Sequence, residues 1–546
     1  MDKEYGIIAN NFSLSVNSSD LILNSKWSIY PKRKVALIGD NGSGKSLLFD
    51  TIYNLYNKDK IKTKISGDIS FITDTKLSYF PQNIQLQFEG TLEEYINLCT
   101  NRSLDLYYKY KNIDNIDNNE QSKILDLINT MNLWDFENRL FSIMDKLDIP
   151  NIYLNKNIKD ISGGESTKIA LIGVLLSDAN ILLLDEPTNN LDNKGVRFLI
   201  DYINDFKYSI FLISHDRYFL DETISEILEI NNKTKSIDFY SGNYSYYLKE
   251  KERYILEQKK LYLKQEKKKK ELKKTEVKLK TKANKIELKS KNAHFRSVGA
   301  KVANKSSILH ERINRDFEKL LPIENDKKSN IEYINTNLEG NVYTLKNIYY
   351  KDIIENISFK IDNTDRIAII GNNGIGKTTI AKLLYQIITP NNGTIYKNEK
   401  FRIYYLPQNI EINNFDENIT DYIRSKTSID INEIETFLGK ILFQNPNNIK
   451  ISHLSFGEIR RLELLSIFIK KPDFLILDEP TNYLDIKTII MLENILNKYN
   501  GGMVVVSHDT RFIENININK IIKIRSKNDF YIYNINENSN IEKDLF

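Results

Sequence analysis

The sequence predicts an α/β fold that occurs twice along the chain, with a long α-helical hairpin between the two copies. Two stretches, 39–46 and 371–378, match the glycine-rich pattern G-x-x-x-x-G-K-[ST]. Each follows an apolar run typical of a buried strand, and the same later motifs come after each in the same order. The 546 residues are therefore an internal duplication, and we expect domains at 1–243 and 331–546 with a linker at 244–330.

The composition argues against a membrane protein and against a protein held by disulfides or thiolate metal clusters. No run of 18 apolar residues occurs, so we expect no membrane span, and the first four residues have no signal-peptide layout. Cys99 is the only cysteine, which excludes a disulfide within the chain and a thiolate metal cluster. These features predict a cytoplasmic protein without a membrane partner.

The predicted linker carries most of the positive charge. Residues 248–320 hold 24 Lys and Arg against 10 Asp and Glu, a net charge of +14 in a chain that sums to +4, which leaves −10 for the rest. A basic segment between two mildly acidic domains favours a polyanionic partner such as a nucleic acid. The alternative is a lysine-rich helix that is only solvated.

The spacing of apolar residues predicts two antiparallel helices in this linker, with an extended chain as the alternative. Tyr247, Tyr254 and Leu261 are seven residues apart, and Leu272 and Leu279 continue the seam after a shift of eleven. One face of the second helix is marked by Leu309, Ile313, Phe317 and Leu320.

Residues 281–301 lose this pattern, and we expect the tip of the hairpin there. This stretch holds His294, Phe295 and Arg296. An aromatic side chain beside cations can stack on an unpaired RNA base while the cations neutralise phosphate. The alternative is a turn in which Phe295 packs between the two helices.

Both glycine-rich stretches have the chemistry of a loop that binds nucleotide phosphates. Glycine lets successive backbone N–H groups turn toward the phosphates, which sit on the N-terminus of the following helix. Lys45 and Lys377 are predicted to reach the β- and γ-phosphates, and the hydroxyls of Ser46 and Thr378 to bind Mg²⁺. The candidate nucleotide-binding residues of the two loops are Gly39, Asn41, Gly42, Gly44, Lys45, Ser46, Gly371, Asn373, Gly374, Gly376, Lys377, Thr378 and Thr379.

In each half an apolar strand ends in two acids, Asp185 with Glu186 and Asp478 with Glu479. The aspartates are candidate Mg²⁺ ligands, and the glutamates are candidates to polarise the attacking water. Hydrolysis of a phosphoanhydride needs mainly positioning and charge neutralisation, so one well-placed carboxylate suffices. Alone, such acids would more often be simple strand ends.

Two further pairs of polar residues follow strands in both halves. His215 and His508 each end an apolar run, and their equivalent positions favour a γ-phosphate sensor over a structural histidine. Gln82 and Gln408 each follow a proline, and a glutamine there can bind both Mg²⁺ and the water. Either pair alone would be ordinary.

A Ser-Gly element lies upstream of each acidic strand. It reads Ser-Gly-Gly-Glu at 162–165 and Ser-Phe-Gly-Glu at 455–458. Serine and glycine at a helix N-terminus form an anion site. The candidate phosphate contacts here are Ser162, Gly163, Gly164, Ser455 and Gly457.

The order of these motifs resembles the ATP-binding-cassette (ABC) ATPases, which implies two ABC domains that hydrolyse ATP with Mg²⁺. In that family two cassettes stack head to tail, and each ATP lies between one phosphate loop and the other cassette's Ser-Gly signature. The resemblance implies that Lys45, Asp185 and Glu186 share a site with Ser455 and Gly457.

By the same resemblance, Lys377, Asp478 and Glu479 share the other site with Ser162 and Gly164. Phe456 replaces the usual glycine of the signature, so unequal activity of the two sites is expected. Tyr350, or its neighbour Tyr349, is the candidate to stack on adenine in the second half.

The whole chain resembles the ABC-F proteins, which bind ribosomes. The motif Asp-Glu-Pro-Thr-Asn-x-Leu-Asp occurs at 185–192 and 478–485, and Tyr-Ser-Gly-Asn-Tyr at 240–244 matches the start of that family's linker. From Gln82 to Ser162 there are 80 residues, against 47 for the matching span in the second half, which predicts an arm insertion at about 90–155.

The resemblance implies a monomer that pairs its own two cassettes and binds the 70S ribosome. The basic linker would enter the E site and meet 23S rRNA and P-site tRNA, with no DNA partner. The linker further resembles the antibiotic-resistance members of the Vga, Lsa and Vml type, which dislodge drugs from the peptidyl-transferase centre. A housekeeping translation factor and the ATPase component of a drug exporter remain alternatives.

Overall fold

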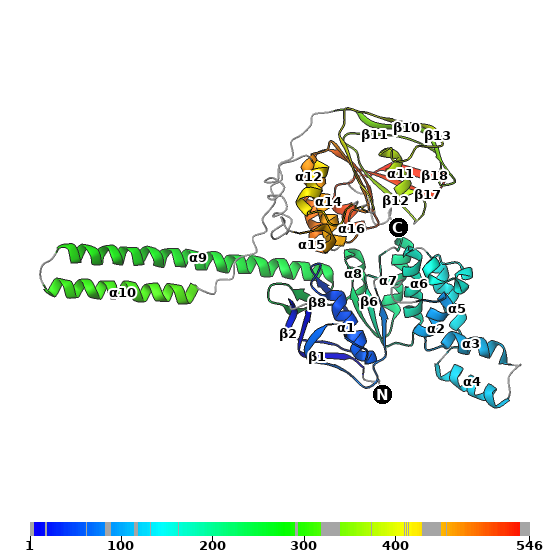
Figure 1. Cartoon of the computed structure of the whole chain (residues 1–546), viewed down its shortest axis with the longest axis horizontal. Helices are drawn as coiled ribbons and strands as arrows, with labels where there is room; N and C mark the ends of the chain where they lie inside the picture. Colours follow the sequence, from blue (N-terminus) through cyan, green and yellow to red (C-terminus); the bar gives the residue numbers. More distant parts are fainter. Residues whose placement is uncertain are drawn as a thin grey trace. The chain divides into compact units, whose positions relative to one another are not determined.

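The structure is a computed structural model, shown in Figure 1. It describes residues 5–16, 19–61, 63–81, 89–113, 118–131, 133–161, 163–189, 191–289, 293–317, 339–372, 374–408, 410, 412, 414–427, 449–454 and 456–535. Two compact units are present. One comprises Met1–Tyr244 with Ile331–Phe546, and the other is Ser245–Asn330.

The first domain is built on a six-stranded sheet in the order β5-β6-β7-β3-β8-β9. Neighbouring strands are parallel except for β9, which is antiparallel to β8. The strands are β3 (Lys34–Gly39), β5 (Leu77–Phe80), β6 (Ile181–Asp185), β7 (Ser209–Ile213), β8 (Glu226–Asn231) and β9 (Ser236–Ser241). A smaller antiparallel sheet, β2-β1-β4, is formed by β1 (Ile7–Val16), β2 (Ser19–Ile29) and β4 (Lys64–Phe71).

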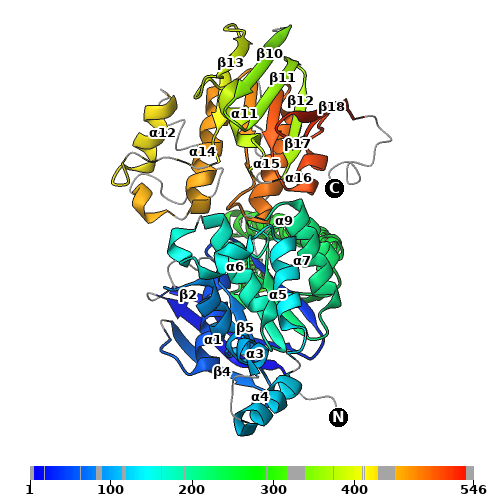
Figure 2. The ribbon, with the colours of Figure 1, turned by 90° about the vertical axis from the view of Figure 1, so that its right-hand side faces the viewer.

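Helices complete this domain (Figures 1 and 2). They are α1 (Lys45–Asn57), α6 (Gly163–Leu176), α7 (Asn193–Asp205) and α8 (Arg217–Thr223), with the short turns η2 (Asn151–Asn155) and η3 (Ile158–Asp160). Every residue of β6 and β7 is buried, as expected for parallel strands covered on both faces.

The predicted insertion is helical in the part of the chain that the structure describes. It contains α2 (Leu92–Cys99), α3 (Ser103–Lys111), α4 (Asn118–Met131) and α5 (Phe136–Lys146), which we call the arm. Thr91 begins α2 with a capping box, because its hydroxyl accepts from the Glu94 N–H while the Glu94 carboxylate accepts from the Thr91 N–H.

The second domain repeats the first, with strand order β14-β15-β16-β12-β17-β18 beside a sheet β11-β10-β13. Its strands are β10 (Asn341–Tyr350), β11 (Ile354–Asp362), β12 (Arg366–Gly371), β13 (Asn392–Lys397), β14 (Ile403–Leu406), β15 (Phe474–Asp478), β16 (Gly502–Val506), β17 (Lys520–Ser526) and β18 (Asp529–Asn534). Its helices are α11 (Lys377–Leu384), α12 (Ile419–Thr427), η5 (Ile451–His453), α14 (Phe456–Lys470), α15 (Ile486–Lys498) and α16 (Thr510–Asn515).

The two faces of the second sheet are covered by different partners. One face packs on α11 and the small sheet, and the other packs on α14, α15 and α16. The duplicated α/β fold joined by a helical hairpin, predicted from the sequence, is therefore confirmed. No described helix combines the length and the apolar character that crossing a bilayer requires.

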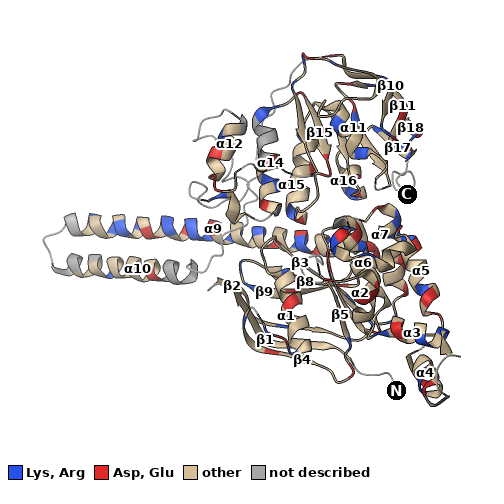
Figure 3. Cartoon of the chain, turned by 45° about the vertical axis from the view of Figure 1, so that its right-hand side comes forward, with Lys and Arg blue, Asp and Glu red and all other residues tan. Residues whose placement is uncertain are grey.

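The hairpin consists of α9 (Tyr244–Lys289) and α10 (Ala293–Phe317), drawn in green in Figure 1. The 46 residues of α9 span about 69 Å at 1.5 Å per residue. Ser306 donates from Oγ to the Glu276 carbonyl oxygen, and the His310 ring lies 3.1 Å from the Glu276 carboxylate. Lysines follow α9 along much of its length (Figure 3).

Part of the predicted seam is wrong. Leu272 and Leu279 are half-buried as expected, but Tyr254 and Leu261 are exposed. The reason is length: with Ser306 opposite Glu276, α10 ends opposite about residue 265 of α9. The first turns of α9 therefore extend beyond the described end of α10. Ile313, Phe317 and Leu320 lie outside the residues whose side chains are described.

The predicted tip is also wrong in extent. Helix α9 continues through 281–289 and α10 starts at Ala293, so most of the stretch from 281 to 301 is helical. Loss of apolar spacing does not imply loss of helix here, because lysine, glutamate and alanine sustain a helix without an apolar face. His294, Phe295 and Arg296 lie in the first turn of α10, and their side chains are outside the described part.

Candidate nucleotide sites

Each phosphate loop lies at the sheet edge that is formed by the carboxyl ends of neighbouring parallel strands. In the first domain β3 lies beside β7, which lies beside β6, so the loop, the histidine and the acids that follow these strands share one edge. Strands β12, β16 and β15 repeat this arrangement in the second domain. The topology therefore assembles residues that are far apart in sequence.

Each lysine of the two loops folds back over its own loop. Lys45 Nζ donates to the carbonyl oxygens of Gly39 at 2.8 Å and Asp40 at 3.2 Å. Lys377 Nζ donates to Gly371 at 2.7 Å and Asn372 at 2.9 Å. Such a lysine holds the loop open around the position that a phosphate would take, ahead of the helix N-terminus.

Glycines supply the backbone turns of these loops. Gly42 and Gly44 have φ of 77° and 94°, and Gly374 and Gly376 have 78° and 106°. Residues with a Cβ rarely adopt these values. The glycines therefore allow both loops to take the inward-turned form.

The two acids of each site are buried at the strand ends. Glu186 and Glu479 have φ of 51° and 46°, a strained conformation for residues other than glycine. Both carboxylate oxygens of Asp185 are buried without a hydrogen-bond partner among the described residues. Asp478 Oδ1 accepts from the hydroxyl of Thr378 at 3.1 Å. In each site a buried aspartate and a serine or threonine hydroxyl form a donor set that suits Mg²⁺ completed by phosphate and water.

Burial controls the protonation of the site. It raises the pKa of Glu186 and of Glu479 to about 8, with a further increase from the neighbouring aspartate, while Lys45 and Lys377 oppose the change. Burial also lowers the pKa of His215 and His508 to about 3, helped by the same lysines.

Each histidine lies against the glutamate of its own site. Nε2 of His215 lies 3.4 Å from Glu186 Oε1, and Nε2 of His508 lies 3.5 Å from Glu479 Oε1. The backbone N–H of His215 also donates to Glu186 Oε2 at 3.2 Å. Burial thus favours the protonated form of both glutamates and the neutral form of both histidines.

The first phosphate loop contacts the second domain. The Asn41 N–H donates to Asp485 Oδ2 at 3.2 Å, and its side-chain amide donates to the Tyr483 carbonyl oxygen at 3.1 Å. A Cβ added to Gly457 would lie 2.6 Å from the same Asn41 amide nitrogen. The loop around Lys45 thus faces the signature element of the other domain.

The two sites differ in their local charge. At matching positions of α1 and α11, eleven residues after Gly39 and Gly371, the chain has Asp50 and Lys382. Burial raises the pKa of both aspartates, that of Asp185 to about 6; Asp50 adds to the rise at Asp185, whereas Lys382 opposes it at Asp478. At this position the second site therefore carries a positive charge where the first carries a negative one.

The matching tyrosines of the two sites also have different partners. The Tyr79 hydroxyl donates to Asp50 at 2.9 Å, and its counterpart Tyr405 donates to Asp478 at 3.4 Å.

The remaining predicted residues are placed as follows. Gln408 follows β14 and is exposed, and Tyr350 ends β10 with the Lys351 ammonium 5.3 Å from its ring centroid. Gly164 lies in the first turn of α6. Outside the described residues lie Gln82, Asn373, Ser162 and Ser455, together with the side chain of Phe456.

The sequence interpretation missed several residues around the sites. Asp485 contacts the opposite loop, and the closing aspartate of its motif was a signal that could have shown this. No sequence motif marked Arg460, Asp50 or Lys382, because the effect of these residues on the sites depends on packing.

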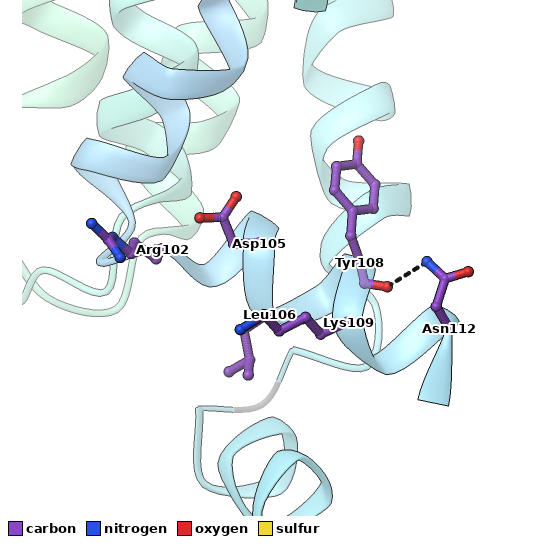
Figure 4. A pocket seen from close by; sticks show the side chains of 6 residues that line it. All are labelled: Arg102, Asp105, Leu106, Tyr108, Lys109 and Asn112. Carbon is purple, nitrogen blue, oxygen red and sulfur yellow. Dashed lines mark hydrogen bonds between the residues drawn. The ribbon is translucent and has the colours of Figure 1, made fainter. Parts of the chain in front are cut away.

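The arm contains a surface pocket, shown in Figure 4. The Asp105 carboxylate accepts from the Asn97 amide at 2.6 Å, so this acid holds the arm together. The pocket lining consists of Arg102, Asp105, Leu106, Tyr108, Lys109 and Asn112. Among the described residues, no group of three or more His, Cys, Asp or Glu side chains is arranged to hold a metal ion alone.

These features define an ATPase of the ATP-binding-cassette class, and the ABC transporter family model matches residues 22–189 and 354–482. Within that class, the chain belongs to the ABC-F family. It is 31% identical over 524 residues to the ATP-binding protein Uup of Buchnera aphidicola, covering 93% of this chain and 78% of that protein.

Other relatives share the same extent of similarity. The energy-dependent translational throttle protein EttA of Escherichia coli is 28% identical over 522 residues, covering 91% of this chain and 88% of EttA. Among solved structures, an archaeal ribosome recycling factor in complex with a ribosomal stalk protein has a TM-score of 0.56 at 16% identity, covering 94% of this chain and 86% of that one. At that identity the likeness concerns the fold alone.

We predict that the buried glutamates make stability depend on pH. The two glutamates bind more protons in the folded state than in the unfolded chain up to about pH 8, whereas the two histidines bind fewer below about pH 6.5. Stability is therefore expected to fall as pH rises from about 6.5 to 8, where the glutamates alone titrate. Replacing both with glutamine, E186Q with E479Q, should raise the melting temperature at pH 8 and stabilise by on the order of 1–3 kcal/mol. Thermal unfolding in EDTA at pH 6.5 to 8.5 measures this.

The matched control is Glu399→Gln, because the Glu399 side chain is 81% exposed. It should leave the pH profile unchanged. An unchanged profile in the E186Q E479Q protein as well would show that neither glutamate is buried with a raised pKa.

Proposed function

We propose that both cassettes bind and hydrolyse ATP at composite sites. In the first, Lys45, Ser46 and Asp185 would hold the phosphates and Mg²⁺, and Gly457 would approach the same nucleotide from the opposite cassette. The contact between Asn41 and the second domain supports this pairing. In the second site the corresponding residues are Lys377, Thr378, Asp478 and Gly164.

In this proposal the side chains of each site position the nucleotide and the attacking water, and they control the protonation of the glutamate. Bound Mg²⁺ would supply positive charge that neutralises the phosphates and favours the ionised form of Glu186 and Glu479. The ionised glutamate then orients water toward the γ-phosphate, while His215 or His508 donates a hydrogen bond to that phosphate. Gln82 and Gln408 are proposed to complete the metal and water contacts, and Tyr350 to stack on adenine.

We further propose that the partner is the ribosome, reached through the hairpin. The observation that carries this proposal is the charge of α9, because a long helix lined with lysines suits the phosphates of rRNA. The similarity to EttA, a translational throttle protein, agrees with this role.

Ribosome binding has two candidate outcomes. We propose that the hairpin tip dislodges antibiotics from the peptidyl-transferase centre, with His294, Phe295 and Arg296 nearest to the drug site. A housekeeping role in translation is the second candidate, and the similarity to EttA favours it.

The double variant E186Q E479Q should bind ATP but lose turnover by at least about tenfold, because the residues that hold phosphate remain. Release from the ribosome is expected to wait on hydrolysis, so this variant should cosediment with ribosomes in ATP more than wild type. ATPase assays and sucrose-cushion sedimentation measure both. Wild-type turnover in the variant would remove the glutamates from catalysis, and sedimentation with membranes instead would favour the exporter alternative.

Removing the charges at 267–270 by substitution with glutamine should weaken ribosome binding in a salt-dependent way. Binding to each phosphate releases about one counterion, so every lost contact lowers the number of counterions released. The slope of log binding constant against log salt concentration should therefore become shallower. Binding measured between about 50 and 200 mM salt tests this. The control is Lys397→Gln, outside the hairpin, which should leave the slope unchanged. An unchanged slope in the hairpin variant would place the RNA contact elsewhere.

Cells that express the chain should tolerate a lincosamide or a pleuromutilin better than cells with an empty vector. Phe295→Ala should abolish this tolerance while ATP turnover and ribosome binding persist, since the tip residues belong to the hairpin and neither ATP site includes them. Minimum inhibitory concentrations measure the effect. Equal values for wild type and empty vector would reject resistance and leave the housekeeping role.

A further inference from the structure

Arg460 is an arginine whose whole side chain is buried inside the second cassette. It is 1% exposed and lies in the second turn of α14. Nη2 donates to the carbonyl oxygens of Asp478 at 2.9 Å and Glu479 at 2.7 Å, and Nη1 donates to the carbonyl oxygen of Pro407. One side chain therefore ties α14 to the acidic strand end and to the residue before Gln408.

The same helix turn reaches the other ATP site. Gly457 precedes Arg460 by three residues and lies against Asn41 of the first phosphate loop, where an added Cβ would be 2.6 Å from the amide nitrogen. Residues three apart in a helix are about one turn apart and move together. The two ends of this turn thus touch the loop of one site and the carboxylate-bearing residue of the other.

The bond to Glu479 acts where the backbone is strained. Glu479 has a φ of 46° and Glu186 has 51°, and a residue keeps such a conformation only when its surroundings fix it. Glu186 keeps it without an arginine at the matching position, so Arg460 is an additional contact at Glu479. Arg460 holds the carbonyl oxygen of this very residue. A charge-assisted hydrogen bond is stronger and more directional than a neutral one, so Arg460 is suited to fix the direction of the glutamate.

The first cassette has no arginine at the position that matches Arg460. Arg460 lies five residues after Ser455, and the residue five after Ser162 is Thr167. A threonine side chain has a single hydroxyl and no charge, so it cannot make three charge-assisted bonds to carbonyl oxygens. Thr167 therefore cannot make the tie that Arg460 makes.

We propose that Arg460 is a positioning residue that couples the two ATP sites, so that closure of the first phosphate loop on Gly457 sets the orientation of Glu479 in the second site. This inference rests on the two composite ATP sites proposed above. Coupling of this kind predicts a dependence of second-site hydrolysis on first-site closure, without the reverse.

Single-site backgrounds allow the test. In an E186Q chain only the second site hydrolyses ATP, and in an E479Q chain only the first. Arg460→Thr, which installs the residue of the matching position, should lower second-site kcat about tenfold or more with KM changed by less than about twofold, because Arg460 does not touch the nucleotide. First-site kcat should stay within about twofold.

A comparison of single and double variants distinguishes coupling between the two ATP sites from a general structural role of Arg460 in α14. Asn41→Ala should lower second-site kcat when Arg460 is present and add no further loss in the Arg460→Thr chain. Arg460→Lys keeps the charge and should recover part of the second-site activity. If thermal unfolding shows that the Arg460→Thr protein does not fold, the Arg460→Lys protein is used in its place. Thr167→Arg is the matched control at the other position.

Two results would overturn the inference. Equal losses at both sites would make Arg460 a general support of α14. Independent, multiplicative losses for the Asn41 and Arg460 changes would show that no signal passes between them. Failure of the wild-type chain to hydrolyse ATP at either site would instead reject the proposed function.

Discussion

The structure depends on charge that the fold buries and leaves partly unpaired. In each cassette, parallel strands deliver an aspartate, a glutamate, a histidine and a lysine to one sheet edge, where water is largely excluded. Burial raises the pKa of Glu186 and Glu479 to about 8, and both oxygens of Asp185 are buried without a hydrogen-bond partner among the described residues. Such an edge is stable only as a protonated resting state or as a site filled by metal and phosphate.

The first of these edges is also joined to the second domain. Asn41 is held by Asp485 and by the Tyr483 carbonyl oxygen, so the loop that surrounds a phosphate is also the contact with the second domain. Duplication gives two such edges, but the chain has made them unequal. Asp50 and Lys382 place opposite charges beside matching aspartates, and Arg460 adds a tie that Thr167 cannot make.

The fold was predictable because its signals are local and repeated. Glycine loops, apolar strands ending in acids, and the order of motifs predicted the duplicated α/β fold and the family. The hairpin tip was predicted too long because a lysine-rich helix needs no apolar face, as 281–289 shows. The left-handed backbone of Glu479 and the burial of Arg460 leave no local pattern, since both arise from packing between distant segments.

The central claim is that a two-site ATPase carries a basic hairpin into the ribosome. Cryo-electron microscopy of the E186Q E479Q chain with ATP, on ribosomes from its own source, tests it most directly. We predict nucleotide between Lys45 and Gly457 and between Lys377 and Gly164, with α9 and α10 inside the E site and the N-terminal end of α10 directed at the peptidyl-transferase centre. Ribosomes without hairpin density, or cassettes that hold nucleotide without the opposite signature, would contradict it.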